Sequence, residues 1–186
     1  MTKVKGLAFR SYSATFKRLH GDEAHARMLE RLPSELGDAL RMGAILTGGW
    51  YPVAWLDQLQ VAVRTQCNQG VELTRAIARE AVKEDFRSGV HRLVTLATSP
   101  EWLIKSSPRI VGFYYDSGRL VVEDAGAGRA MGRYEGFEGF TQDLWVQLIG
   151  GSMGVIELAG AKAPVAKVLA GGNAGDGHMT FTIKWS

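Results

Sequence analysis

The sequence has one cysteine, no long apolar run and no large excess of charge of either sign. With Cys67 alone, an internal disulfide and a cysteine metal cluster are both impossible, which suits a reducing cytoplasm. No window reaches the roughly 18 uninterrupted apolar residues of a membrane span. The first residues also lack the apolar core of a signal peptide. We therefore expect a cytoplasmic protein without a membrane span.

The charges are scattered and nearly balanced, with 22 basic and 19 acidic residues and a net charge of +3. Nucleic-acid binding normally needs clustered lysines and arginines with interleaved aromatic residues, because phosphate neutralisation supplies much of the affinity. We therefore expect no nucleic-acid partner. A chain of 186 residues fits one domain, and no linker-like or repetitive segment divides it. Residues 1–186 are expected to form that single domain.

The first half of the sequence predicts helices. One helix is expected to begin at Asp22 and to end before Pro33, and a short one covers 34–42. Residues 48–52, Gly-Gly-Trp-Tyr-Pro, predict a turn that leads into the next helix. Apolar residues recur at steps of three and four in three further segments, which predicts helices over 52–69, 71–86 and 90–97.

The second half predicts a sheet and one long helix. Runs of β-branched and aromatic residues at 109–115 and 119–123, separated by Asp116-Ser117-Gly118, predict a β-hairpin, and a third strand is expected over 129–134. Helical spacing returns over 141–159. The last segment predicts a second hairpin around 173–177, in which alternate residues face a buried side: Met179, Phe181, Ile183 and Trp185. The predicted class is α+β, with a helical N-terminal half followed by an antiparallel sheet packed against a long C-terminal helix.

Two glycine-rich segments invite a ligand-binding interpretation. The segment 121–136 has the spacing G-x-G-x-x-x-G and no good helix start after it, so it differs from a dinucleotide fingerprint and predicts a strand, a turn and a strand. In the predicted helix 141–159, Gly150, Gly151 and Gly154 each cost roughly 1 kcal/mol relative to alanine. They indicate a close approach by a neighbouring backbone, as in tight helix-on-sheet packing, or by a ligand; a helix kink would leave the same pattern.

The sequence contains no recognisable catalytic or metal-binding motif. A G-x-S-x-G elbow, an HExxH zinc motif and two histidines at helical metal spacing are all missing. Adjacent acidic residues point to different faces and do not predict a shared acid–base site. Cys67 lies on the apolar face of its predicted helix, where a thiol usually serves packing. We expect no catalytic residue and no metal; the side chains weighed for such roles are Ser11, Ser13, His20, His25, Glu84, Asp85, Glu123 and Asp124.

Several segments together resemble an uncharacterised family abundant in myxobacteria: RLPSEL, WYPVAWL, SPEWLIKSSPRIVGFYYDSGRL, ELAGAK and GDGHMTFTIKW. That family is similar to the vinyl-reductase-like domains, the haem-based nitric-oxide sensors and the trafficking subunits of the TRAPP complex. The resemblance implies their shared fold, a helical N-terminal part with an antiparallel sheet backed by a helix. It also implies small-molecule sensing or dimeric scaffolding rather than one particular reaction.

The haem sensors in this superfamily hold the haem propionates with Tyr-x-Ser-x-Arg. Residues Tyr115–Arg119 match this pattern, and His91 lies upstream as a conceivable axial ligand. In the sensors, however, the motif leads into a helix, whereas here it is expected in a turn between two strands. The vinyl-reductase-like domains carry cysteines in the last hairpin, and residues 170–181 contain none. No cofactor is therefore expected, and haem sensing stays an alternative.

These observations favour a non-catalytic sensory or regulatory module. It would bind a small hydrophobic ligand in a pocket between helices and sheet, since such pockets are mostly apolar with a few placed polar groups. The large side chains proposed to line the pocket are Trp50, Trp55, Phe113, Tyr115 and Trp145. One alternative is a homodimeric scaffold that packs through helices of its N-terminal half and acts through protein–protein contacts. An enzyme is a further, weaker alternative.

Overall fold

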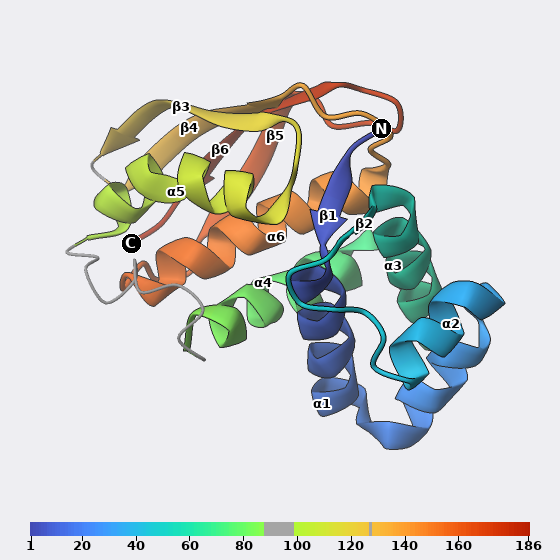
Figure 1. Ribbon diagram of the computed structural model, residues 1–186. Helices are drawn as coiled ribbons and strands as arrows, with labels where there is room; N and C mark the ends of the chain where they lie inside the picture. The colour runs from blue at the N-terminus through green and yellow to red at the C-terminus, as the bar shows by residue number, and fades with distance from the viewer. Residues whose placement is uncertain (88–98, 127) are drawn as a thin grey trace.

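The fold is taken from a computed structural model, which describes residues 1–87, 99–126 and 128–186. Helices and strands are layered, with a four-stranded sheet on top, α5 and α6 beneath it, and the remaining helices below (Figure 1). The elements are β1 (Lys3–Lys5), α1 (Gly6–Glu30), α2 (Ser34–Arg41), β2 (Trp50–Pro52), α3 (Val53–Cys67), α4 (Val71–Arg87), α5 (Pro100–Tyr114), β3 (Arg119–Gly126), β4 (Arg129–Glu135), α6 (Gln142–Leu158), β5 (Val165–Gly171) and β6 (His178–Lys184). The predicted helix over 90–97, with His91, lies outside the described residues.

Helix α1 starts well before the predicted position at Asp22. It is broken at Gly21, whose φ of 87° lies in the left-handed region that glycine adopts at little cost. The predicted helix corresponds to the part after this break. The part before it buries Phe9, Tyr12 and Phe16 in the core, so burial of large side chains holds this segment in helical form.

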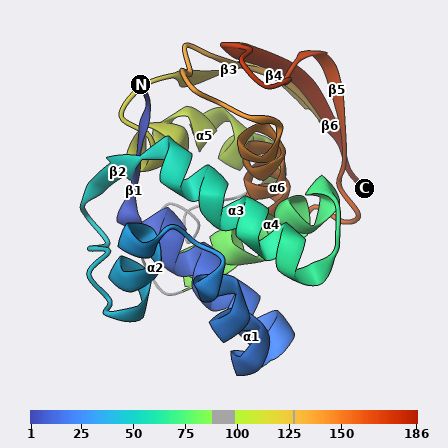
Figure 2. The same ribbon diagram turned by 90° about the vertical axis from the view of Figure 1, so that its right-hand side faces the viewer.

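The segment predicted as a simple turn at 48–52 contains a short strand. Residues Trp50–Pro52 form β2, which pairs antiparallel with β1, and Val4 lies opposite Tyr51. A single further bridge joins Val4 to Tyr115. The first strand therefore links the helical half to the end of α5, two parts of the molecule that lie side by side in Figure 2.

The strand predicted at 109–115 is wrong, because these residues continue helix α5. Ser99 caps this helix by accepting a hydrogen bond from the Trp102 backbone N–H at 3.2 Å, and Pro100 occupies the first turn. Pro108 lies inside the helix and lacks the N–H that would bind the Ile104 carbonyl. The Ser107 hydroxyl donates to that carbonyl instead, at 2.6 Å. The connection at 116–118 therefore joins a helix to a strand and does not form a hairpin.

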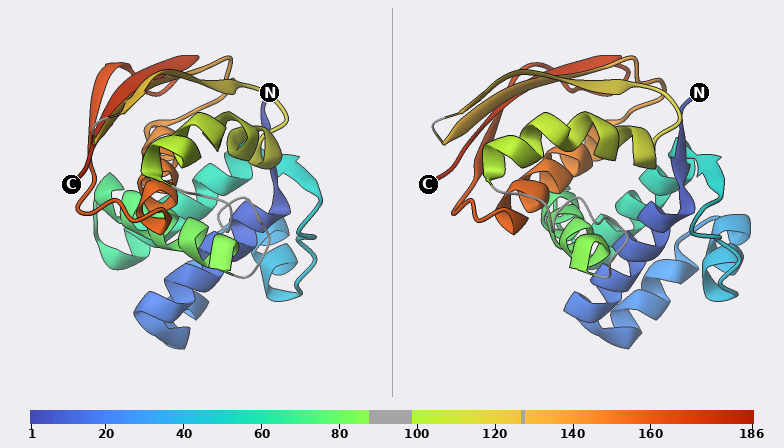
Figure 3. Two further views of the ribbon diagram at one scale, coloured as in Figure 1. Left: turned by 90° about the vertical axis from the view of Figure 1, so that its left-hand side faces the viewer. Right: turned by 60° about the vertical axis from the view of Figure 1, so that its left-hand side comes forward.

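Apart from the strand expected at 109–115, the sheet matches the prediction. Its four strands run antiparallel in the order β3-β4-β6-β5. The glycine-rich segment 121–136 forms strand, turn and strand, as predicted. The alternation in the last strand is also confirmed, since Met179, Phe181 and Ile183 are buried, while Trp185 follows the end of the strand and is half-buried. Helices α5 and α6 lie beneath this sheet, with α4 below α6 (Figure 3).

A buried ion pair joins the helical half to α6. Asp143, in the first turn of α6, accepts two hydrogen bonds from the Arg64 guanidinium of α3, at 2.7 and 2.8 Å. It also accepts one from the Thr74 hydroxyl of α4 at 2.8 Å. The carboxylate is almost completely buried, and these three bonds compensate for its loss of hydration.

The glycines of α6 have two different roles. A Cβ at Gly150 would collide with the carbonyl of Arg75, and one at Gly154 with the carbonyl of Arg79, so both glycines let α4 approach closely. The packing is thus helix on helix, where the sequence had suggested helix on sheet. Gly151 differs, because a Cβ there would meet nothing within 4 Å.

Alanine substitutions should separate these two roles. Gly154→Ala is expected to lower the free energy of unfolding by about 1–3 kcal/mol, because the added methyl group forces α4 and α6 apart. Gly151→Ala in the same helix should leave stability unchanged or raise it by up to about 1 kcal/mol. Urea unfolding monitored by circular dichroism measures both, and equal losses in the two variants would contradict this assignment.

Candidate functional site

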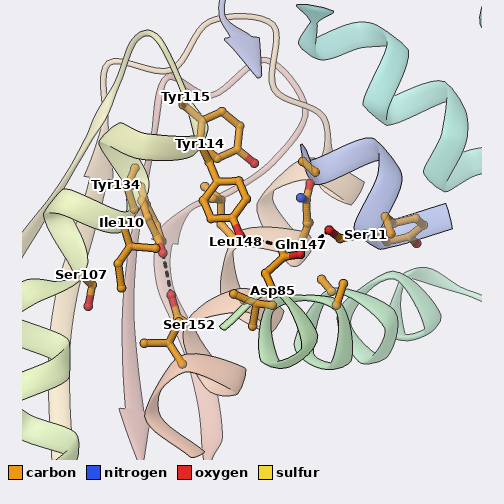
Figure 4. Close-up of a pocket in the computed structure, with 18 residues that line it drawn as sticks. Ser11, Asp85, Ser107, Ile110, Tyr114, Tyr115, Tyr134, Gln147, Leu148 and Ser152 are labelled. Carbon is orange, nitrogen blue, oxygen red and sulfur yellow. Dashed lines mark hydrogen bonds between the residues drawn. The ribbon is translucent and has the colours of Figure 1, made fainter. Parts of the chain in front are cut away.

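A cavity of about 90 Å³ lies between helices and sheet, in the position expected for the pocket (Figure 4). Its described walls come from α1, α4, α5, α6 and β4. Much of the wall is aliphatic and built from small side chains. The apolar lining residues are Ala8, Ala78, Ala81, Val82, Ile110, Val111, Leu148 and Val155.

A polar cluster centred on Asp85 of α4 forms one side of the cavity. The Asp85 carboxyl group accepts hydrogen bonds from the Ser11 hydroxyl and from the Tyr114 hydroxyl, the latter at 2.6 Å. These groups come from three helices that are far apart in sequence, α1, α4 and α5. Burial raises the pKa of Asp85 above its usual value, and the two hydrogen bonds oppose this rise only in part. Figure 4 shows the three side chains converging at the cavity wall.

Tyr134 and Tyr115 also face the cavity, and Tyr12 of α1 lines it as well. The Tyr134 hydroxyl, from β4, forms a hydrogen bond with the Ser152 hydroxyl of α6 at 2.7 Å. The Tyr115 hydroxyl projects into the open space in Figure 4 and, within the described residues, has no hydrogen-bond partner. Burial raises the pKa of Tyr115 above its usual value, so this hydroxyl stays protonated at neutral pH.

Of the five side chains proposed from the sequence to line a pocket, Tyr115 lines this cavity. Trp145 is 1% exposed in a cluster with Phe137 and Phe140, and its indole N–H donates to the Asn173 carbonyl at 3.1 Å. Trp50 is 43% exposed, and the Lys5 ammonium lies over both its ring and that of Phe113. Trp55 stacks on Tyr51 near β2.

Sequence reasoning missed Asp85, Tyr114 and Ser11 as members of one cluster. A usable signal was present for Asp85. It follows Ala78, Ala81 and Val82 at helical steps, so it lies on the apolar face of α4, where a carboxyl group needs partners. Tyr114 was misplaced because its segment was assigned to a strand, and the proximity of Ser11 arises only from the packing of α1 against α4.

The side chains of the Tyr-x-Ser-x-Arg pattern have different surroundings. Of the matching pattern, Tyr115 faces the cavity, but the Ser117 hydroxyl donates to the Thr2 hydroxyl at 2.9 Å. The Arg119 side chain is 75% exposed, and it donates to Glu135 at 2.7 Å. The three side chains therefore do not converge on one group. The cavity is also smaller than the roughly 300–1,000 Å³ typical of cofactor sites.

Metal-binding and membrane-spanning features are both missing from the described ranges. There, no group of three or more His, Cys, Asp and Glu side chains is placed to hold a metal ion. No helix in those same ranges has both the length and the apolar character needed to cross a membrane.

The chain has the fold of H-NOX domains. A mutant H-NOX protein from K. algicida, solved in the Fe(II) unliganded form, is similar with a TM-score of 0.73 and 14% identity, over 98% of this chain and 96% of that one. An oxygen-binding H-NOX domain related to soluble guanylate cyclases is similar with a TM-score of 0.60 and 15% identity, over 98% and 95%. No family model and no curated protein sequence matches the chain.

These similarities confirm the predicted α+β architecture of haem-NO-binding type. At 14–15% identity they show the fold alone. The resemblance to vinyl-reductase-like domains, TRAPP subunits and a myxobacterial family stays a prediction.

The raised pKa of Asp85 should appear in the pH dependence of stability. The folded state holds the Asp85 proton more tightly than the unfolded state does. The contribution of this proton to the free energy of unfolding is therefore fully present below about pH 4, and it is lost as pH rises through the pKa of Asp85 in the folded state. Asp85→Asn cannot ionise and should lack this loss. In urea unfolding from about pH 4 to 7, the stability of Asp85→Asn relative to the wild type should therefore rise with pH. The exposed Asp22→Asn serves as control, and parallel curves for all three proteins would contradict the prediction.

Proposed function

We propose that this protein is a non-catalytic sensory or regulatory module that binds a small, mostly apolar ligand in the cavity between α4, α5, α6 and the sheet. The observation that carries the proposal is Gly151, a mid-helix glycine that lines the cavity without any backbone pressed against it. A glycine here costs roughly 1 kcal/mol relative to alanine, yet no packing constraint requires it. Any side chain larger than that of glycine at position 151 would fill part of this open space.

The composition of the cavity wall supports binding rather than catalysis. Aliphatic side chains dominate, and a few polar groups converge from different elements, as in typical ligand pockets. Both oxygens of Asp85 already accept hydrogen bonds from protein hydroxyl groups. This is the arrangement expected of a side chain that forms a fixed part of the cavity wall and takes no part in a reaction. The similar H-NOX structures include one described as an oxygen complex, and this supports use of the fold for holding small ligands.

The alternative of a homodimeric scaffold stays a prediction. In the described part of the first half, the large apolar side chains that are exposed between α2 and β2 are Met42, Leu46 and Trp50. Helices α1 and α3 add single residues, Leu19 and Val61. These positions do not single out one helical face for dimerisation.

Filling the cavity tests the proposed function. The small apolar probe 2-methylpropene should bind the wild type and shift the methyl resonances of Val82, Val111, Leu148 and Val155 in NMR spectra. Gly151→Leu should abolish these shifts because its side chain occupies the same space. Gly112→Leu is the matched control, since Gly112 lies in α5, is exposed, and also has open space at its Cβ position. Equal binding by all three proteins, or by none, would overturn the proposal.

Haem binding can be tested separately. Since Tyr115, Ser117 and Arg119 do not converge, titration of the protein with haemin is expected to give no stoichiometric Soret band of bound haem. The absorption spectrum measures this directly. A stoichiometric band that disappears in His91→Ala would instead establish a haem sensor.

A further inference from the structure

We propose that the Tyr115 hydroxyl donates a hydrogen bond to the ligand and makes the cavity selective for small neutral molecules that carry one acceptor, such as a ketone oxygen. This inference rests on the proposed function, because it names the chemistry of a ligand in the same cavity. It assigns to Tyr115 a binding role inside the cavity, separate from Ser117 and Arg119.

The position of Tyr115 is fixed by its backbone and by its ring. Its backbone N–H donates to the Val111 carbonyl at 3.0 Å, at the end of α5, and the residue bridges to Val4 of β1. Its ring packs edge-on against Phe137, with ring centroids 5.5 Å apart, and lies near Phe140 at 5.8 Å. The hydroxyl is therefore held in one direction, into the cavity (Figure 4).

Four tyrosines line the cavity, and the Tyr115 hydroxyl differs from those of Tyr114 and Tyr134. The Tyr12 hydroxyl, which also has no hydrogen-bond partner among the described residues, is completely buried. Tyr114 donates to Asp85, and Tyr134 is bonded to Ser152. Tyr115 is only 5% exposed, yet within the described residues its hydroxyl has no partner. Buried polar groups in folded proteins nearly always have a partner, because an unmade hydrogen bond is costly. An acceptor placed in the cavity supplies the missing bond.

The residues around the cavity limit the kind of ligand that can carry this acceptor. An anion is disfavoured because the Asp85 carboxyl group lines the same cavity and none of the described lining residues is basic. Any charged ligand would also lose its hydration against the aliphatic wall. A cavity of about 150 Å³ holds benzene, which has six heavy atoms, so a cavity of about 90 Å³ limits the ligand to about four heavy atoms.

The hydroxyl is tested with a pair of probes that differ only in the acceptor. Acetone and 2-methylpropene have nearly the same shape, but only the ketone accepts a hydrogen bond. Tyr115→Phe should weaken acetone binding about tenfold and leave 2-methylpropene binding within about twofold. Tyr51→Phe, which removes a hydroxyl outside the cavity, should weaken neither probe. Dissociation constants come from titrations followed by methyl NMR.

Stability provides a second readout that a purely structural role would move. Tyr115→Phe should leave the urea midpoint unchanged, because no protein hydrogen bond is lost, whereas Tyr114→Phe should lower it. If both probes bind and Tyr115→Phe weakens neither, the inference is overturned and the proposed function survives. If Tyr115→Phe lowers stability as Tyr114→Phe does, the hydroxyl serves the fold and the inference is overturned. If neither probe binds the wild type, both proposals fall.

Discussion

The close contact between α4 and α6 is the constraint on which the cavity depends. Gly150 and Gly154 bring the backbone of α4 against α6, and this fixes the spacing of the two helices. At that spacing Asp85 of α4 reaches the same space as Tyr134 of the sheet and Tyr115 at the end of α5. A wider separation would move Asp85 away from Tyr114 and open the wall. Gly151, next to Gly150 in α6, lines the cavity, and a Cβ there would meet no atom within 4 Å.

The sequence predicted the fold better than the site. Strand alternation in Met179, Phe181 and Ile183 and the glycine turn between β3 and β4 were strong local patterns, and the structure confirms both. Helix α5 was missed because its second half is rich in β-branched and aromatic residues, and because Pro108 argues against a helix. Tertiary burial and the Ser107 hydrogen bond outweigh those preferences. The cavity residues come from five elements, and no local pattern contains their packing.

The side chains of the pattern Tyr-x-Ser-x-Arg lie in different parts of this molecule. In this chain the serine bonds to Thr2 and the arginine to Glu135 at the outside of the sheet, while the tyrosine alone turns inward. Similarity of sequence over five residues therefore says little until the direction of each side chain is known. The fold is shared with H-NOX domains, but the use of these three positions is set by local partners.

The bridge between Val4 and Tyr115 has a consequence for the order in which the molecule assembles. The backbone of Lys3 and the side chain of Asp116, 113 residues apart, are also joined by a hydrogen bond. Closing so long a loop costs conformational entropy before any contact offsets it, and such contacts slow folding. Tyr115 therefore pairs with the first strand only when this long loop is closed, and one part of the cavity wall depends on a contact between the start and the middle of the chain.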